Sequence, residues 1–180
     1  MAVCTVLRLG DPRLRQRARA VVDGHDPDLR QLITDVHDTM AACGGAGLAA
    51  PQIGVPLRVL LFGGGGPNPR YPDAPPLPRT LLINPERTPA GGRARRGLGG
   101  VPECAGATGT GVALAAVALP GDRWRGPARR SLRGWLPCWV VQHECDHLDG
   151  VLFPDRLSDP TAFGFIPELE AAGLIPAVPG

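Results

Sequence analysis

The sequence predicts a single domain that combines helices with short strands. A chain of 180 residues can bury one real core but would be crowded as two domains. Helical patterns occur near residues 26–45 and 140–150, and two short apolar runs, residues 55–62 and 80–85, have the character of buried strands. No internal repeat is visible.

The first helix is predicted in the segment DPDLRQLITDVHDTMAACGG, residues 26–45. Asp26 can cap this helix, and Pro27 suits its first turn. Apolar side chains at helical spacing mark one face, namely Leu29, Leu32, Ile33, Val36 and Met40. Gly44 and Gly45 are expected to end the helix.

Two strands with a loop between them are predicted next. The run VPLRVLLF, residues 55–62, is typical of a buried strand, and TLLINP, residues 80–85, is a second one. The intervening GGGGPNPRYPDAPPLP, residues 63–78, is too rich in Gly and Pro to be anything but a loop.

The pattern weakens from about residue 91 to residue 139, where Gly, Ala, Arg, Pro and Trp mix with little alternation. Only GVALAAVAL, residues 111–119, resembles a strand. A second helix is predicted from Val140 to about Gly150, and the tail, residues 161–180, could add one short helix.

Composition favours a soluble, cytoplasmic protein. The net charge of +2 is too small to make DNA or an anionic membrane the main partner. The basic runs at residues 93–96 and 123–133 could suggest RNA binding. A displaced reading frame in GC-rich DNA, which yields Arg, Gly, Ala and Pro, explains them more simply. The five cysteines form an odd set without framework spacing, and the N-terminus has no signal-peptide pattern. We therefore expect reduced thiols and no transmembrane helix.

A metal-binding motif stands in the second helix, in the stretch VVQHECDHLDGVLF. His143 and His147 are four residues apart and share one face of a helix, so both imidazoles can meet one cation. Glu144 lies next to His143 and could act on a water at that cation. The pentapeptide H-E-x-x-H alone is weak, because two histidines and a glutamate can also form an ordinary polar helix face.

A second group of residues strengthens the prediction, in GAGLAAPQIG, residues 45–54. Gly45 and Gly47 allow the backbone to come close to a ligand. Gln52 follows a proline and could direct its amide at a developing oxyanion. The simpler alternative is a helix end followed by a turn.

Together the two groups resemble the peptide deformylase family in its bacterial form. The family's first motif, G-x-G-L-A-A-P-Q, is complete at residues 45–52, and its third, Q-H-E-x-D-H, is complete at residues 142–147. The opening VLRLGDPRLR and the trailing DGVLFPDRLS are also similar. The resemblance covers residues 1 to about 90 and 139 to about 160.

The resemblance implies an α+β fold with small mixed or antiparallel sheets packed around a central helix that carries H-E-x-x-H. It implies a metal-dependent hydrolase that removes the N-formyl group from the N-terminal methionine of newly made proteins and releases formate. Fe²⁺ is the metal implied, with Zn²⁺ or Ni²⁺ as substitutes. Formyl-methionyl nascent peptides would be the partners, with association with ribosomes and a monomeric state expected.

The resemblance also implies roles for individual residues. His143 and His147 would bind the metal, and Glu144 would act as general acid and base. Gln52 would stabilise the oxyanion. Gly45, Gly47 and Leu48 would line the substrate groove.

The family's second motif, E-G-C-L-S, is missing from the sequence. In the family it supplies a thiolate ligand from its Cys. The nearest literal alignment sets RGLGGVP against it and puts Leu98 at the position of the sulfur. Leucine cannot bind a metal, so the third ligand has to be found elsewhere.

Codon arithmetic suggests that residues 97–139 are read in a displaced frame. If each codon's last two bases are joined to the first base of the next, Val101 and Pro102 can give TGC, which encodes Cys. The neighbouring codons allow W-E-G-C-L-S-V-P-G, and the codons of residues 135–139 allow G-F-P-A-R before VVQHE. We hypothesise that residues 97–139 are the frameshifted translation of a deformylase gene.

In the chain as written, Cys104 is the candidate third ligand, because it lies closest to the lost motif. An incidental thiol in a loop is the simpler interpretation of Cys104. Cys138 is the other nearby sulfur, and Cys145 should point away from the face of His143. Two histidines alone should hold iron weakly, because the softness of a thiolate is lost.

Two alternatives remain open at this point. One is an inactive homologue or pseudogene product that lacks the thiolate ligand. The other is a zinc metallopeptidase, although Phe153 occupies the position of that class's third histidine. Glu168 or Glu170 could replace it as a carboxylate ligand, but a metallopeptidase does not explain GLAAPQ.

The frameshift hypothesis predicts the bases of the gene itself. Sequencing genomic DNA across the codons of residues 97–139 should reveal Cys-Leu-Ser in the displaced frame and one compensating base near Trp139. Bases at Val101 and Pro102 that cannot spell Cys in that frame would rule the hypothesis out.

Overall fold

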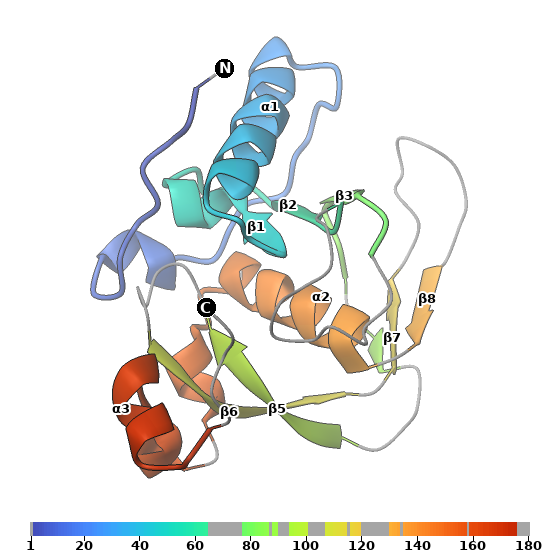
Figure 1. Ribbon diagram of the computed structural model, residues 1–180. Helices are drawn as coiled ribbons and strands as arrows, with labels where there is room; N and C mark the ends of the chain where they lie inside the picture. Colours follow the sequence, from blue (N-terminus) through green and yellow to red (C-terminus); the bar gives the residue numbers. More distant parts are fainter. Residues whose placement is uncertain are drawn as a thin grey trace.

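The computed structural model describes residues 2–64, 77–86, 88–89, 94–100, 107–114, 116–119, 130–133, 135–157 and 159–175. Across these residues, three antiparallel three-stranded sheets surround one helix, α2 (Trp135–Leu148). Figure 1 shows α2 between the sheet that contains β1 and β2 and the sheet that contains β5 and β6. The α+β fold implied by the resemblance is therefore confirmed.

One sheet is made of three consecutive strands, and each of the other two includes a strand that is distant in the sequence. The first has the order β1 (Gly47–Ala49), β2 (Val59–Phe62) and β3 (Thr80–Ile83). The second has the order β4 (Thr88–Pro89), β7 (Ala116–Leu119) and β8 (Arg130–Arg133). The third has the order β5 (Ala94–Gly100), β6 (Ala107–Leu114) and β9 (Phe163–Phe165).

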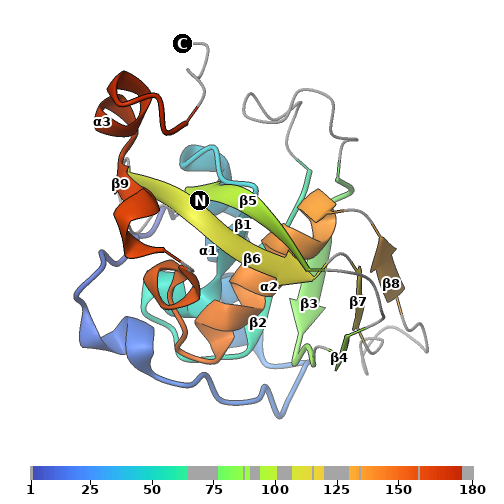
Figure 2. The ribbon, with the colours of Figure 1, turned by 90° about the horizontal axis from the view of Figure 1, so that it is seen from below.

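The other helical elements flank these sheets. Among the described residues they are α1 (Pro27–Ala42), α3 (Ile166–Ala171) and the short 3-10 helices η1 (Pro12–Arg15), η2 (Ala50–Ile53), η4 (Phe153–Arg156) and η5 (Pro160–Ala162). Figure 2, seen from below, shows β5 and β6 crossing one side of α2, with β9 and α3 beyond one end of β6.

The first helix forms as the sequence predicts. Asp26 caps α1 by accepting a hydrogen bond from the backbone N–H of Asp28 at 2.9 Å, and Pro27 is its first residue. Of the predicted apolar face, all but the partly buried Ile33 are fully buried. Gly44 follows the end of the helix with φ of 60°.

The first sheet separates two apolar clusters because its side chains alternate between its faces. Leu48, Val59 and Leu61 pack with α1, whereas Ala49, Leu60 and Phe62 pack with α2. The pairing of β1 with β2 matches Gly47 to Phe62 and Leu48 to Leu61. This register turns Gly47 toward α2, which positions the site described below.

The second helix begins earlier than predicted. Its start at Trp135, rather than at Val140, places Pro137 in the first turn, where the missing backbone N–H breaks no helical hydrogen bond. The sequence of residues 135–139 gave no clear periodicity, so the earlier start was not visible.

Residues 97–139 contain more strand than their sequence indicates. The prediction recognised only residues 111–119, which the structure divides between β6 and β7. β5 pairs with β6 from Ala94 opposite Leu114 to Gly100 opposite Thr108, and β6 also pairs with β9 from the tail. Strand formation here depends on pairing between the strands, because the local residues, rich in Gly and Ala, do not favour it.

The C-terminal end of α2 is closed by a complete Schellman motif. The N–H of Val151 donates to the carbonyl of Asp146 at 2.9 Å, and the N–H of Gly150 donates to that of His147 at 3.3 Å. Gly150 has φ of 72°, and a Cβ at this position would collide with the backbone carbonyl of Arg15. Only glycine fits both requirements.

Some predicted features lie outside the described residues. Most of the Pro-rich loop, residues 65–76, is among them, as are the last residues of the tail, 176–180. The short helix predicted in the tail is confirmed as α3. None of the described helices is both long and apolar enough to cross a membrane.

Replacing Gly150 with Ala should therefore lower the free energy of unfolding by more than the ~1–2 kcal/mol of the left-handed conformation alone, because the backbone of η1 must also move. Gly44→Ala is the matched control, since Gly44 also follows a helix with positive φ but has nothing within 4 Å of an added Cβ. Urea unfolding of both variants measures the difference. Equal losses would contradict the close approach at Gly150.

Candidate active site

The two motif histidines lie on one face of α2, and their rings converge. The Nε2 atoms of His143 and His147 are 3.1 Å apart, and the rings meet edge to face with centroids 4.6 Å apart. His147 is almost completely buried, whereas His143 is partly exposed. The structure thus brings together the two predicted ligands.

The separation of these nitrogens fits a shared metal ion. Two imidazole nitrogens bound at 2.0–2.1 Å to a tetrahedral zinc ion would lie about 3.3 Å apart. The 3.1 Å between the Nε2 atoms is close to that value. Without a cation, two adjacent ring nitrogens must share one proton or repel each other. The donor set is therefore suited to a divalent ion of the zinc or iron type.

The Glu144 carboxylate lies directly against the backbone of Gly47. A Cβ built on Gly47 would be 2.5 Å from Oε1 of Glu144 and 2.8 Å from its Cδ and Cγ. Glu144 itself is 3 % exposed. The glycine of the first motif therefore makes room for the glutamate of the third.

Gln52 is completely buried in η2, and one side of its amide is already engaged. Its Oε1 accepts a hydrogen bond from the backbone N–H of Ala49 at 2.7 Å. Because a backbone N–H can only donate, this contact identifies the oxygen of the amide and leaves donation to Nε2. The orientation agrees with the predicted role of Gln52 as an oxyanion donor.

The residues predicted to line the substrate groove differ in how their side chains and main chain are placed. Gly45 lies just after the end of α1 and donates its N–H to the carbonyl of Met40 at 3.1 Å. The side chain of Leu48 is buried in the cluster on the α1 side of the sheet, away from Glu144. Any contact of Leu48 with a substrate would therefore be made by its main chain.

No third ligand is visible among the described residues. They contain no group of three His, Cys, Asp or Glu side chains that could hold a metal. Cys104, the candidate from the sequence, lies outside the described residues. Cys145 is buried in the apolar cluster between α2 and the first sheet, as expected for a residue on the opposite side of the helix.

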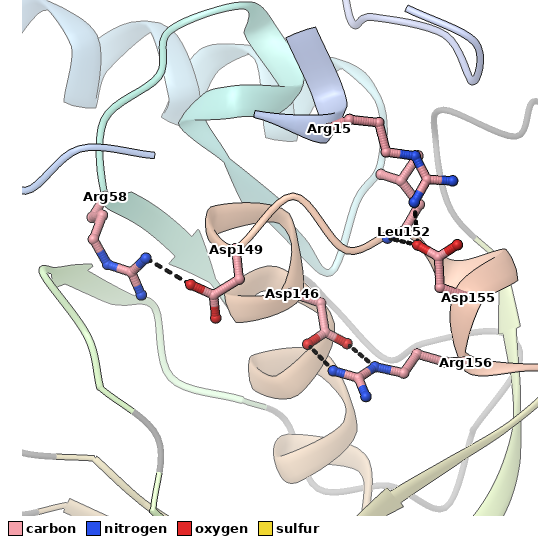
Figure 3. A network of polar contacts seen from close by, with 7 residues as sticks. All are labelled: Arg15, Arg58, Asp146, Asp149, Leu152, Asp155 and Arg156. Carbon is pink, nitrogen blue, oxygen red and sulfur yellow. Dashed lines mark hydrogen bonds and ion pairs between the residues drawn. The ribbon is translucent and has the colours of Figure 1, made fainter. Parts of the chain in front are cut away.

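The residues that support the motif helix are not recognisable from the sequence. Figure 3 shows Arg156 of η4 binding Asp146 of α2, and Arg58 binding Asp149 just beyond the helix. Phe153 packs its ring against His143 with centroids 6.4 Å apart. No local signal identifies these pairs, because the partners are up to 91 residues apart.

Comparisons with known proteins point to one family. Residues 3–162 match the family described as polypeptide deformylase. Peptide deformylase 1 of Prochlorococcus marinus is 53 % identical over 178 residues, which cover 97 % of this chain and 91 % of that protein. Peptide deformylase 2 of Ralstonia nicotianae is 44 % identical over 170 residues, covering 92 % and 96 %.

Solved structures agree with the sequence comparison. The Met-Ala-Ser-bound crystal structure of the class I type b peptide deformylase of Acinetobacter baumannii matches with a TM-score of 0.80 and 31 % identity. The match covers 87 % of this chain and 99 % of that one. The peptide deformylase of Thermotoga maritima matches with a TM-score of 0.75 and 27 % identity, covering 88 % and 100 %.

Gly47→Ala should lower kcat by a factor of about 10² or more, because the new methyl group displaces a carboxylate placed for proton transfer. Steady-state kinetics on a formylated methionyl peptide measures the effect. Gly164→Ala is the control, since this strand glycine faces only the flexible side chain of Leu169. A Gly47→Ala variant with unchanged kcat would show that the carboxylate does not act from this position.

Proposed function

Because the chain belongs to the polypeptide deformylase family, we propose that the site on α2 performs the family's reaction with the residues named above. The reaction is hydrolysis of the formyl group from the N-terminus of newly made peptides, and the enzyme is a metal-dependent hydrolase. One observation carries the proposal. The ring nitrogens of His143 and His147 converge beside Glu144, which itself lies against the first-motif backbone at Gly47.

The two histidines would hold the metal through their Nε2 atoms. A divalent ion bound there would act as a Lewis acid and lower the pKa of water, so that a nucleophile forms near neutral pH. The carboxylate of Glu144 would accept a proton from the attacking water. As the C–N bond breaks, Glu144 would deliver that proton to the methionine nitrogen, and formate and a free amine would leave.

Gln52 would stabilise the charge that develops on the formyl oxygen. Its Nε2 group is the donor, because Oε1 is engaged by Ala49. A donor that is already oriented before reaction needs no rearrangement as the charge appears. The main chain of Gly45, Gly47 and Leu48 would bind the peptide by backbone hydrogen bonds.

Iron is the metal we propose, with zinc or nickel as substitutes. The third ligand depends on the gene. If residues 97–139 arise from a frameshift, the restored motif would provide the thiolate; if the chain exists as written, Cys104 is the candidate.

The Met-Ala-Ser ligand of the Acinetobacter structure is the peptide that remains when formyl-Met-Ala-Ser loses its formyl group. We accordingly propose formyl-methionyl nascent peptides as substrates, in the cytoplasm, with a monomeric enzyme that can associate with ribosomes.

Because residues 3–162 match the polypeptide deformylase family, we no longer consider the alternative of a zinc metallopeptidase. The alternative of an inactive homologue is decided by metal content: about one divalent ion per chain is expected for a working site, and a preparation without metal would favour the inactive homologue. A Cys104→Ser variant that keeps its metal would remove Cys104 as a ligand.

Formate release from formyl-Met-Ala-Ser should be measured under anaerobic conditions with the iron-loaded chain. Glu144→Gln should lower kcat by a factor of about 10² to 10⁴, and a chelator should abolish activity. Glu168→Gln, at an exposed carboxylate of α3, is the control and should change neither kcat nor KM. Cleavage of an internal peptide bond without formate release would contradict the proposal.

A further inference from the structure

The short helix η4 contacts α2 at two points beside the metal-binding histidines. Arg156 donates from Nε to Oδ2 of Asp146 at 2.9 Å and from a terminal nitrogen to Oδ1 at 2.8 Å. Phe153 places its ring against that of His143. Asp146 immediately precedes His147. The four residues of η4 therefore bind the chain neighbour of His147 and contact the ring of His143.

The Arg156–Asp146 pair can fix the rotation of α2 about its axis. Two parallel hydrogen bonds between a guanidinium and a carboxylate restrict both distance and angle, unlike a contact to a point charge. The side chain of Asp146 is only 9 % exposed but that of Arg156 is 46 % exposed, so the ion pair is closed to water only on its carboxylate side. The hydrogen bonds to Asp146 also raise the pKa of Arg156 above its ordinary value.

Phe153 acts on the other histidine by packing. It is 3 % exposed and forms a small apolar cluster with Trp139, Leu157 and Phe163. Trp139 lies one helical turn before His143 on the same face of α2. Phe153, held in this cluster, therefore supports the imidazole of His143 from the side.

The position of η4 is itself fixed from outside α2. Asp155 accepts a hydrogen bond from the N–H of Leu152 at 2.8 Å and forms an ion pair with Arg15 of η1 (Figure 3). Burial alone would raise the pKa of Asp155, but these hydrogen bonds and the nearby arginine charges outweigh it and lower the pKa. The carboxylate consequently stays ionised at neutral pH.

We infer that η4 is a positioning element for the two histidine rings: Arg156, acting through Asp146, fixes the rotation of the helix turn that carries them, and Phe153 fixes the ring of His143. Neither residue touches the reacting atoms. The inference rests on the proposed function, because the positioning would serve to hold the two histidines in place before a metal binds. Supporting residues of this kind typically change metal affinity 10- to 100-fold.

The test compares four variants with the unaltered full chain. Arg156→Gln and Phe153→Leu remove one contact each, and Arg156→Lys keeps the charge but loses the paired hydrogen bonds. Arg58→Gln is the matched control, because Arg58 also binds a carboxylate at this end of α2, Asp149, at 2.8 Å, but its other hydrogen bonds go to the carbonyls of Leu148 and Pro85 rather than to η4. Co²⁺ titration with its visible absorption spectrum, and crystal structures of the metal-free proteins, are the two measurements.

We expect Arg156→Gln and Phe153→Leu to weaken Co²⁺ binding by a factor of about 10 or more and to alter the spectrum. In the crystals, Arg156→Gln should rotate the helix turn that carries the histidines, and Phe153→Leu should widen the separation of their Nε2 atoms. Arg156→Lys should be intermediate. Arg58→Gln should lower the unfolding midpoint but keep the affinity, the spectrum and the separation.

The inference is overturned if Arg156→Gln and Phe153→Leu keep both the affinity and the positions of the histidine rings, or if Arg58→Gln changes them equally. If Arg156→Gln does not fold, Phe153→Leu and Arg156→Lys decide. If the unaltered chain binds no Co²⁺, the proposed function fails, while the crystallographic positions of the histidine rings still test the positioning role.

Discussion

The chemistry of this chain depends on one turn of α2, from His143 to His147, being held between two sheets at a fixed depth and rotation. A shift along the axis would separate Glu144 from Gly47, where the two already meet without room for a methyl group. A rotation would move both ring nitrogens together. The remaining structure can be understood as the set of contacts that prevents these two movements.

Different physical interactions restrict each movement. Apolar packing of Val141, Cys145 and Leu148 against the first sheet sets the depth, because these residues occupy the face opposite the histidines. The Schellman motif at Gly150 ends the helix at a defined residue, and the guanidinium of Arg58 binds the carbonyl of Leu148 there at 3.3 Å. The ion pair of Asp146 with Arg156 then restricts rotation.

Local patterns predicted the elements that depend on local interactions. The cap at Asp26, the apolar face of α1 and the buried strand β2 are encoded within a few residues, and all are present. The start of α2 was missed because residues 135–139 show no helical periodicity. The strands β5 and β8 were missed because their own residues do not favour a strand until they pair with β6 and β7. In the site, the spacing of His143 and His147 predicted their convergence, whereas the sequence could not show that Leu48 turns its side chain toward α1. Arg156 and Phe153 were missed for a related reason: only the folded chain brings them beside the histidines.

The central claim is that the histidine pair on α2 is a metal site in this chain. X-ray absorption spectroscopy of the zinc-loaded protein tests it most directly, because imidazole nitrogens and thiolate sulfur scatter at different distances. The account predicts two imidazole nitrogens at about 2.0–2.1 Å, and a sulfur at about 2.3 Å if a cysteine completes the site. A first shell without imidazole would contradict it.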